Sequence, residues 1–148
     1  MINQLHLFAF ICFVLSACNQ CKDKCVNGVC IEKYCDCDVW YEGDKCDRSQ
    51  LSTYEGEYKG VFSFGTESQS VSFNLTSSTE TPSILYSTAN DLKFEFTTIT
   101  RFNFPAQNWM GKIWIGEGEM LFDLMSIRLQ FTDSTGVQHG LIEAYRAD

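Results

Sequence analysis

The sequence predicts a mainly β protein in two parts, a small disulfide-stapled module followed by a larger antiparallel β domain. Two observations carry this prediction. All eight cysteines lie within the first 46 residues of the 148-residue chain. The remainder consists of short runs in which apolar and polar residues alternate, which is the period-two pattern of half-buried strands. We therefore expect a cysteine-rich beginning and a cysteine-free β domain.

Composition and charge limit the class of protein. The hydrophobic content of 45% and the aromatic content of 14% exclude a wholly disordered chain, which would have few aromatics and high charge. The formal net charge of −8 argues against a nucleic-acid partner, because phosphate binding requires clustered Lys and Arg. We interpret the acidic surface as a feature that keeps the protein soluble.

Residues 1–17 are predicted to be an export signal. Every residue from 7 to 15 is apolar. Such a run is shorter than the roughly 20 residues that span a bilayer, but it has the length of the apolar core of a signal peptide. The small residues Ser16 and Ala17 then form a cleavage site.

The tetrad Leu15-Ser16-Ala17-Cys18 resembles the lipobox of bacterial lipoproteins, which has an aliphatic residue, two small residues and a cysteine. The resemblance implies that Cys18 carries a diacylglyceryl group and that residues 18–20 form an acylated amino terminus. Acyl chains such as palmitate would hold the mature protein on the membrane of the bacterial cell envelope. Residues 1–6 contain no Lys or Arg. The alternative is therefore a plain secretory signal and a secreted protein.

The number of cysteines favours the lipid. Cys12 leaves with the signal and Cys18 is used by the lipid, so six cysteines remain, an even number suited to three disulfides. A Cys18 thiol would leave seven. A segment as short as residues 21–46 cannot bury enough apolar surface to fold without cross-links. Spacing alone does not choose among the possible pairings.

Residues 21–47 resemble an EGF-like module with tenascin-type spacing. The resemblance lies in Asn27-Gly28 before the third cysteine of this segment, in Cys35-Asp36-Cys37, and in the run 40–46 that ends at the last cysteine. It implies a two-stranded sheet near residues 29–36. The acidic residues of calcium-binding members are missing, so no metal is expected. The disulfide pairs that the resemblance implies are Cys21–Cys30, Cys25–Cys35 and Cys37–Cys46.

Residues 48–53 are mostly polar and are predicted to be a linker, and residues 54–148 are predicted to be the β domain. The run 120–129 is the one place where a helix is an alternative. Clusters of Gly, Ser, Thr, Asn and Pro separate the strands. The predicted strands cover residues 54–64, 71–75, 92–96, 111–115, 119–124, 126–133 and 138–146.

Short strands in succession predict an antiparallel meander, closed as an up-and-down barrel or packed as a two-sheet sandwich. Gly56-Glu57-Tyr58 resembles the first strand of lipocalin-like barrels, which often carries Gly-x-Trp. We prefer the lipocalin-like barrel for this reason. The resemblance implies an interior that can hold a small apolar ligand.

The sequence shows no catalytic motif, so we predict neither an enzyme nor a cofactor. Glu117, Glu119 and Asp123 would suit a glycosidase-like carboxylate pair, but we prefer a solvated outer face for them. We interpret His139 as a turn or strand-edge residue. Trp109 is predicted to lie in a loop and is the candidate for ligand contact, since exposed aromatics serve carbohydrate and peptide sites.

The predicted function is non-enzymatic binding or adhesion by a membrane-anchored surface lipoprotein, with an envelope protein or a glycan as the partner. Two alternatives remain at this point. One is an accessory subunit of an envelope complex, and the other is a carrier of a small apolar ligand inside the barrel.

Overall fold

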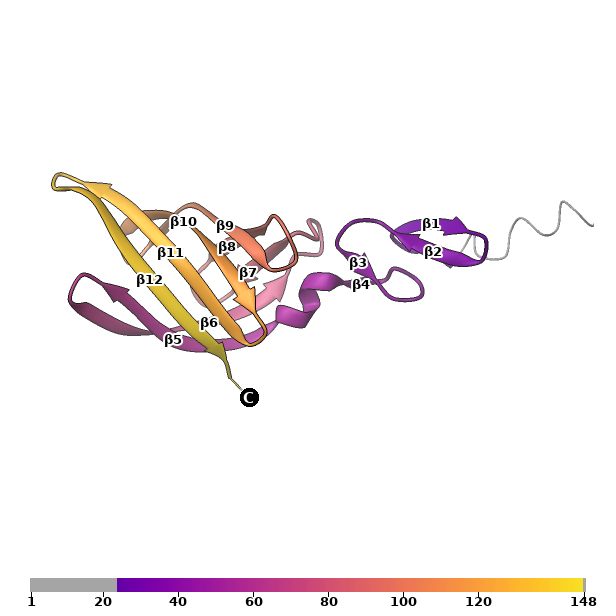
Figure 1. Ribbon diagram of the computed structural model, residues 1–148, viewed down its shortest axis with the longest axis horizontal. Helices are drawn as coiled ribbons and strands as arrows, with labels where there is room; N and C mark the ends of the chain where they lie inside the picture. Colours follow the sequence, from indigo (N-terminus) through magenta and orange to yellow (C-terminus); the bar gives the residue numbers. More distant parts are fainter. Residues whose placement is uncertain (1–23, 148) are drawn as a thin grey trace, which may run out of the picture. The chain divides into compact units, whose positions relative to one another are not determined.

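The computed structural model describes residues 24–147 and divides between Arg48 and Ser49 into two compact units, each of which is described by itself (Figure 1). The division falls where the cysteine-rich part of the sequence ends. The predictions made for the export signal, for lipidation of Cys18 and for the bond to Cys21 lie outside the described residues.

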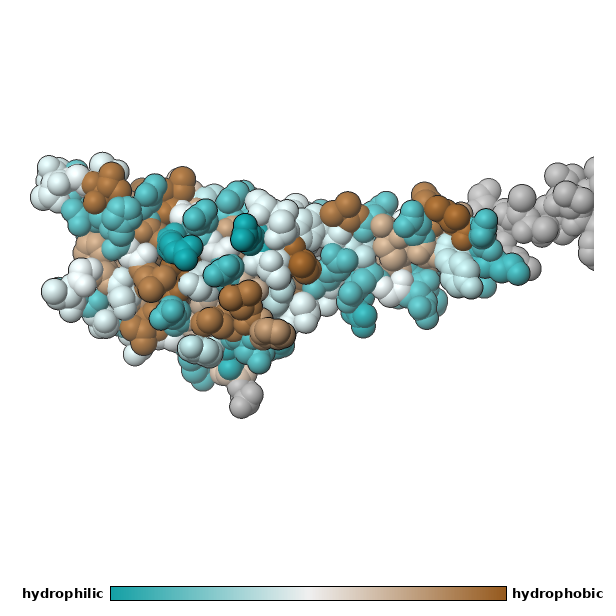
Figure 2. All heavy atoms as spheres, viewed as in Figure 1, coloured by the Kyte–Doolittle hydropathy of each residue, from teal (hydrophilic) through white to brown (hydrophobic). Residues whose placement is uncertain are grey.

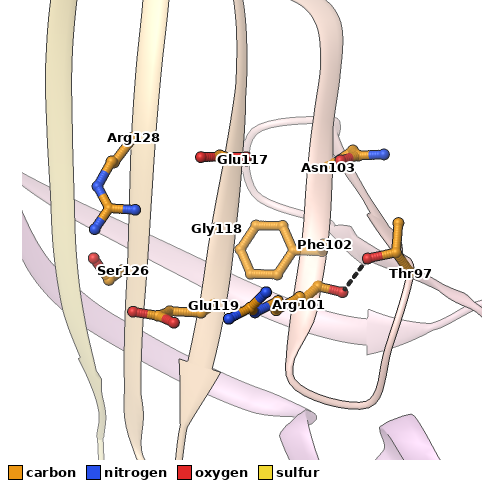
Figure 3. Close-up of a pocket in the computed structure, with 9 residues that line it drawn as sticks. All are labelled: Thr97, Arg101, Phe102, Asn103, Glu117, Gly118, Glu119, Ser126 and Arg128. Atoms are coloured by element: carbon orange, nitrogen blue, oxygen red, sulfur yellow. Dashed lines mark hydrogen bonds between the residues drawn. The ribbon is translucent and has the colours of Figure 1, made fainter.

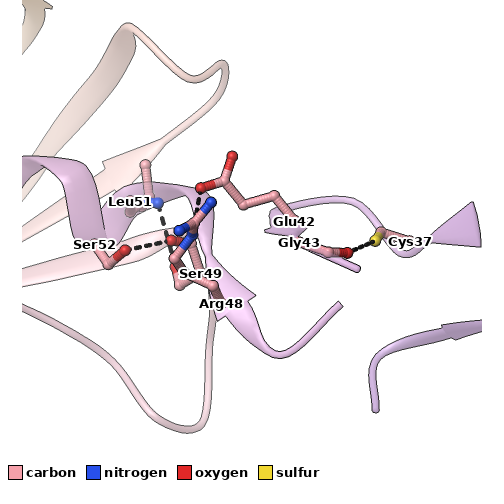
Figure 4. Close-up of polar contacts among 7 residues, drawn as sticks. All are labelled: Cys37, Glu42, Gly43, Arg48, Ser49, Leu51 and Ser52. Carbon is pink, nitrogen blue, oxygen red and sulfur yellow. Dashed lines mark hydrogen bonds and ion pairs between the residues drawn. The ribbon is translucent and has the colours of Figure 1, made fainter. Parts of the chain in front are cut away.

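The first unit is a disulfide-bonded module with two small sheets. Strands β1 (Gly28–Ile31) and β2 (Tyr34–Cys37) form an antiparallel ribbon, and β3 (Tyr41–Glu42) pairs with β4 (Arg48–Ser49). The bonds Cys25–Cys35 and Cys37–Cys46 are both present, as the EGF-like resemblance implies. Cys30 is disulfide-bonded as well. In the second sheet, Arg48 Nε lies 2.8 Å from a carboxylate oxygen of Glu42 (Figure 4).

Residues 50–54 form a short 3-10 helix, η2 (Gln50–Tyr54), where the sequence predicts a linker over 48–53. Ser49 caps it, because its hydroxyl accepts a hydrogen bond from the backbone N–H of Leu51 at 3.2 Å (Figure 4). Leu51 and Tyr54 are buried, and the Tyr54 ring stacks on Phe96 with centroids 6.0 Å apart. Ser52 and Thr53 separate Leu51 from Tyr54, so the sequence has no apolar pattern here from which this packing could be predicted.

The second unit is a closed barrel of eight antiparallel strands, each paired with its neighbour in the chain, and β12 pairs with β5 to complete the circle. The barrel excludes the sandwich, and the run 120–129 is strand and turn, not helix. Two of the strands, β7 and β9, were not predicted. The strands are β5 (Gly56–Phe64), β6 (Glu67–Ser77), β7 (Ile84–Ser87), β8 (Leu92–Phe96), β9 (Arg101–Trp109), β10 (Lys112–Leu121), β11 (Leu124–Asp133) and β12 (Gly136–Arg146).

Aromatic rings fill the barrel interior, which accounts for the high Phe content of the chain. Alternate residues of each strand point inward, as the period of a strand requires. The rings touch one another in an unbroken series, with each centroid 4.6–6.2 Å from the next. From one end of the barrel to the other, the series is Tyr54, Phe96, Phe102, Phe94, Phe73, Trp109, Phe62, Trp114, Phe131 and Phe64.

The barrel wall is irregular around Pro105. The β9–β10 register shifts between Trp114 and Gly116, and Pro105, which has no backbone N–H, lies opposite this shift. The β8–β9 ladder has only two residue pairs. The amide group of Gln107 extends it, because its Oε1 accepts from Lys93 N at 2.8 Å and its Nε2 donates to Lys93 O at 2.9 Å. A side chain therefore replaces a backbone pair at this seam.

The two ends of the barrel are closed differently. At the end where β5 begins, Arg146 donates to the backbone carbonyls of Thr53 and Glu55 at 2.9 and 2.6 Å and fixes the helix against β12. At the other end, Lys112 Nζ lies 3.9 Å from the ring centroid of Phe131, a cation–π contact. The barrel is thus covered by a short helix at one end and by an ammonium group over aromatic rings at the other.

Candidate functional site

The candidate site is a polar hollow of about 380 Å³ on the outer wall of β9, β10 and β11 (Figure 3). Pairing between strands places Arg101 opposite Glu119 and Arg128 opposite Glu117. The two glutamates of β10 therefore lie between one arginine on β9 and one on β11. We call this surface the outer polar face and define it by six residues: Arg101, Asn103, Glu117, Glu119, Ser126 and Arg128.

The strand period explains why polar side chains gather here. In β9, Arg101 and Asn103 flank Phe102, which points into the barrel and is 2% exposed. In β10, Glu117 and Glu119 flank Gly118. The sequence prediction that these two glutamates share one solvated face is confirmed. Figure 3 shows the Phe102 ring beside Gly118, between the strands that carry the polar groups.

The cations of this face are distinguished by having no partner. Among the six Lys and Arg residues between 49 and 147, only Arg101 and Arg128 make no ion pair, hydrogen bond or ring contact through their side chains. Both line the same hollow. The other four are engaged within the barrel: Lys59 with Glu57 at 3.0 Å, Lys93 with Glu95 at 2.6 Å, Lys112 with the Phe131 ring, and Arg146 with backbone carbonyls.

A guanidinium presents five donors in a planar fork that suits carboxylate, sulfate or phosphate oxygens, and a carboxylate accepts from hydroxyl, amide or ammonium groups. The outer polar face therefore offers both donors and acceptors. Lys93, by contrast, is not available to a partner. There the hydrogen bond to Glu95 raises the pKa of the ammonium and engages it within the wall.

The polar surface continues toward β12. A second hollow of about 430 Å³ shares Asn103, Glu117 and Arg128 with the first and reaches His139. His139 lies within β12, opposite Gln130 of β11, and its side chain is exposed. The prediction of a turn or strand-edge position for it is wrong. Its outward position adds an imidazole to the border of the outer polar face.

The structure corrects the prediction for Trp109. This residue ends strand β9, and its ring is only 6% exposed. It packs edge-on against Phe62, with centroids 4.9 Å apart, and its backbone carbonyl accepts a hydrogen bond from Trp114 Nε1 at 3.1 Å. The polar sequence around Trp109 suggested a loop because Pro105 interrupts the alternation of the strand. Trp109 is a core residue and offers little surface to a ligand outside the barrel.

The candidate carboxylate set is only partly assembled. Glu117 and Glu119 lie together on the outer polar face, whereas Asp123 lies in the turn between β10 and β11. No group of three His, Cys, Asp or Glu side chains between residues 24 and 147 is arranged to hold a metal ion. In the same part of the chain, no helix has the length and apolarity needed to cross a membrane.

Sequence reasoning did not select the arginines, the asparagine or the serine of this face. The sequence indicates only that these residues occupy outward-facing positions of the strands, and many solvated residues do the same. Comparisons with known proteins add no assignment. No protein-family model matches the chain, and neither the curated proteins nor the solved structures give a significant match.

Proposed function

We propose that this protein is a non-enzymatic binding lipoprotein of the bacterial cell envelope, anchored through Cys18, and that its barrel recognises a partner through the outer polar face. The anchor rests on the resemblance of residues 15–18 to a lipobox. The EGF-like identity of the module is supported by the bonds Cys25–Cys35 and Cys37–Cys46. In this proposal the module is a spacer and the barrel is the recognition part.

The observation that carries the proposal is the pair of unpartnered guanidinium groups, Arg101 and Arg128, beside Glu117 and Glu119. Neither guanidinium makes an ion pair, and even a formed ion pair at a protein surface contributes little to stability, so the fold does not depend on these charges. Charges of both signs in a fixed pattern give specificity toward a surface with the opposite pattern. An envelope protein or a glycan that carries acidic groups would present such a surface.

The packing of the interior favours binding on the outside of the barrel. Its rings form an unbroken series, and both Trp109 and Trp114 lie within it. A small apolar ligand would have to displace several of these rings. The ligand-carrier alternative is thus less well supported than recognition by the outer wall.

The test of recognition compares two variants of the full-length protein. In the first, Arg101 and Arg128 are both replaced by Gln. In the control, Lys59 and Lys93, which are engaged in ion pairs elsewhere on the barrel, are both replaced by Gln. Binding to a glycan array and to solubilised envelope proteins is measured for each. We expect the first variant to lose about tenfold in affinity and the control to retain wild-type binding. Equal binding by both variants would refute the assignment of the face.

The anchor has its own test. Cells that express the full-length chain are fed a radiolabelled fatty acid, and the wild type is compared with Cys18→Ser. We expect label in the wild type and none in the variant. Label that persists in the variant would exclude Cys18 as the lipidated residue.

A further inference from the structure

We propose that the β1–β2 ribbon of the module lies in the headgroup region of the bilayer, with the side chains of Val29, Ile31 and Tyr34 against zwitterionic lipid. This inference rests on the proposed lipidation of Cys18. It adds a second point of membrane contact, made by the folded module itself, to the covalent anchor.

The ribbon has two faces of different chemistry. The register pairs Gly28 with Cys37 and Cys30 with Cys35, so the disulfide-bonded cysteines share one face. The intervening pairs, Val29 with Asp36 and Ile31 with Tyr34, belong to the other face. The strand period thus separates the covalent staples from a face that carries three apolar side chains and the exposed carboxylate of Asp36.

The apolar face is strongly exposed. The exposed fractions are 59% for Val29, 52% for Ile31 and 79% for Tyr34. Figure 2 shows hydrophobic residues on the surface over β1 and β2. Single exposed apolar residues are common, but three of the four side chains on this face are apolar and exposed, which is typical of a surface that contacts a partner.

Chain length determines which partner is within reach. Lys24, the first described residue, is six residue steps along the chain from Cys18, and an extended chain spans at most about 3.6 Å per step, so the distance is at most about 22 Å. The Cys21–Cys30 bond that the EGF-like resemblance implies would shorten this path to the three residue steps from Cys18 to Cys21, or about 11 Å. Cys30 itself lies between Val29 and Ile31 in β1. The lipid anchor therefore holds the ribbon close to the bilayer surface.

The side chains suit this location. Transfer of the Val29 and Ile31 side chains from water to the boundary of the acyl chains is favourable in free energy. A Tyr ring with its polar hydroxyl is favoured at the membrane–water interface. Lys33, in the turn between the two strands, has a long side chain that can reach lipid phosphate groups. Because the chain carries a net charge of −8, an anionic surface would repel it, and a zwitterionic lipid is the better partner.

The test uses full-length protein from a bacterium that processes lipoproteins, reconstituted in phosphatidylcholine vesicles. Tyr34→Trp places a fluorescent probe on the apolar face. Phe122→Trp places the same probe at a strongly exposed position on the barrel, where Phe122 is 95% exposed. Tryptophan emission is measured with and without lipid brominated near the headgroup end of its acyl chains, and the wild-type signal is subtracted. The mass of the amino-terminal peptide is determined on the same samples.

We expect the Tyr34→Trp emission to shift to shorter wavelength on reconstitution and to lose about half of its intensity to the brominated lipid, as an interfacial tryptophan does. The Phe122→Trp emission should not change. A lipidated sample in which the Tyr34→Trp probe is not quenched overturns the ribbon contact and leaves the anchor in place. An unmodified Cys18 in the mass spectrum overturns both proposals.

Discussion

The ring of Phe102 lies directly against the backbone of Gly118, its partner across the β9–β10 pair. A Cβ atom at position 118 would stand only 2.3 Å from Cζ of Phe102. The ring cannot easily move, because it also packs on Phe94 and Phe96 with centroid distances of 5.5 and 5.1 Å. The absence of a side chain in β10 therefore makes room for an aromatic residue from β9, directly beneath the outer polar face.

This relationship gives a first prediction. Gly118→Ala should destabilise the barrel by about 1–3 kcal/mol, the usual cost of an overpacked core. Gly118 has no positive φ angle, so the effect reports on packing and not on backbone strain. The measurement is guanidinium unfolding followed by tryptophan fluorescence. In a double-mutant cycle with Phe102→Leu, the two losses should sum to more than the loss of the double variant. If the stability losses of the two single variants were strictly additive, the Phe102 ring would not be what opposes a side chain at position 118.

The amide of Gln107 gives a second prediction. Gln107→Ala removes two hydrogen bonds to the backbone of Lys93, so we expect a loss of about 1–2 kcal/mol and faster hydrogen exchange at the Lys93 amide. Gln107→Glu should fall between Ala and the wild type, because a carboxylate keeps the acceptor and loses the donor. Asn108→Ala, at the exposed neighbouring position, is the control. Unchanged exchange at Lys93 in both Gln107 variants would contradict the role of this side chain.

The turn between β10 and β11 gives a third prediction. Phe122 has a φ of 56° and is 95% exposed, so a bulky residue occupies a conformation that favours glycine without any gain from burial. Phe122→Gly should raise the free energy of unfolding by about 1 kcal/mol. Phe122→Ala removes the ring but keeps the Cβ atom and should give a smaller gain. A loss of stability in the glycine variant would mean that the ring makes contacts that stabilise the fold.

Tyr58 gives a fourth prediction, on pH dependence. Its ring is fully buried, and its hydroxyl has no hydrogen-bond partner among residues 24–147. Burial raises the pKa of Tyr58 above its ordinary value of 10.0. A raised pKa in the folded state means that the wild type loses stability as the pH rises from about 10 toward the folded-state pKa.

Tyr58→Phe removes both the unpaired buried hydroxyl and its ionisation at high pH. We expect it to match or exceed the wild type at pH 7, by up to about 1 kcal/mol, because an unpaired buried hydroxyl is costly. It should also lose less stability in alkali. Burial raises the pKa of Tyr54 as well, so a residual alkaline loss is expected in the variant. Tyr145→Phe, at a position 61% exposed, is the control. Equal alkaline losses in wild type and Tyr58→Phe would contradict this account.

The period of the sequence was sufficient to predict the fold class and several elements. The alternation over 92–96 matches β8 in full. The predicted strands 111–115 and 119–124 divided β10 in two and left Gly116 and Gly118 outside both. In the structure they lie inside one strand, where the backbone carbonyl of Arg128 and the ring of Phe102 occupy the space that side chains would need. Packing between strands, which the order of residues does not reveal, decided this difference.

The candidate site was less accessible to sequence reasoning. Exposure of Trp109 was inferred from its polar neighbours, whereas tertiary packing placed it in the core. The arginines of the outer polar face became notable only when the partners of all other barrel cations were known. A missing ion pair is a property of three-dimensional structure. It has no signature in composition or spacing.

The central claim, that the outer polar face recognises a partner in the envelope, is tested most directly by photocrosslinking in intact cells. The crosslinker p-benzoylphenylalanine is placed at Asn103 on the face, or at Lys59 elsewhere on the barrel wall, in the full-length chain. We expect a discrete adduct from position 103 and none from position 59, with the adduct lost when Arg101 and Arg128 are both changed to Gln. An adduct from position 59 alone, or none from position 103, would contradict the claim.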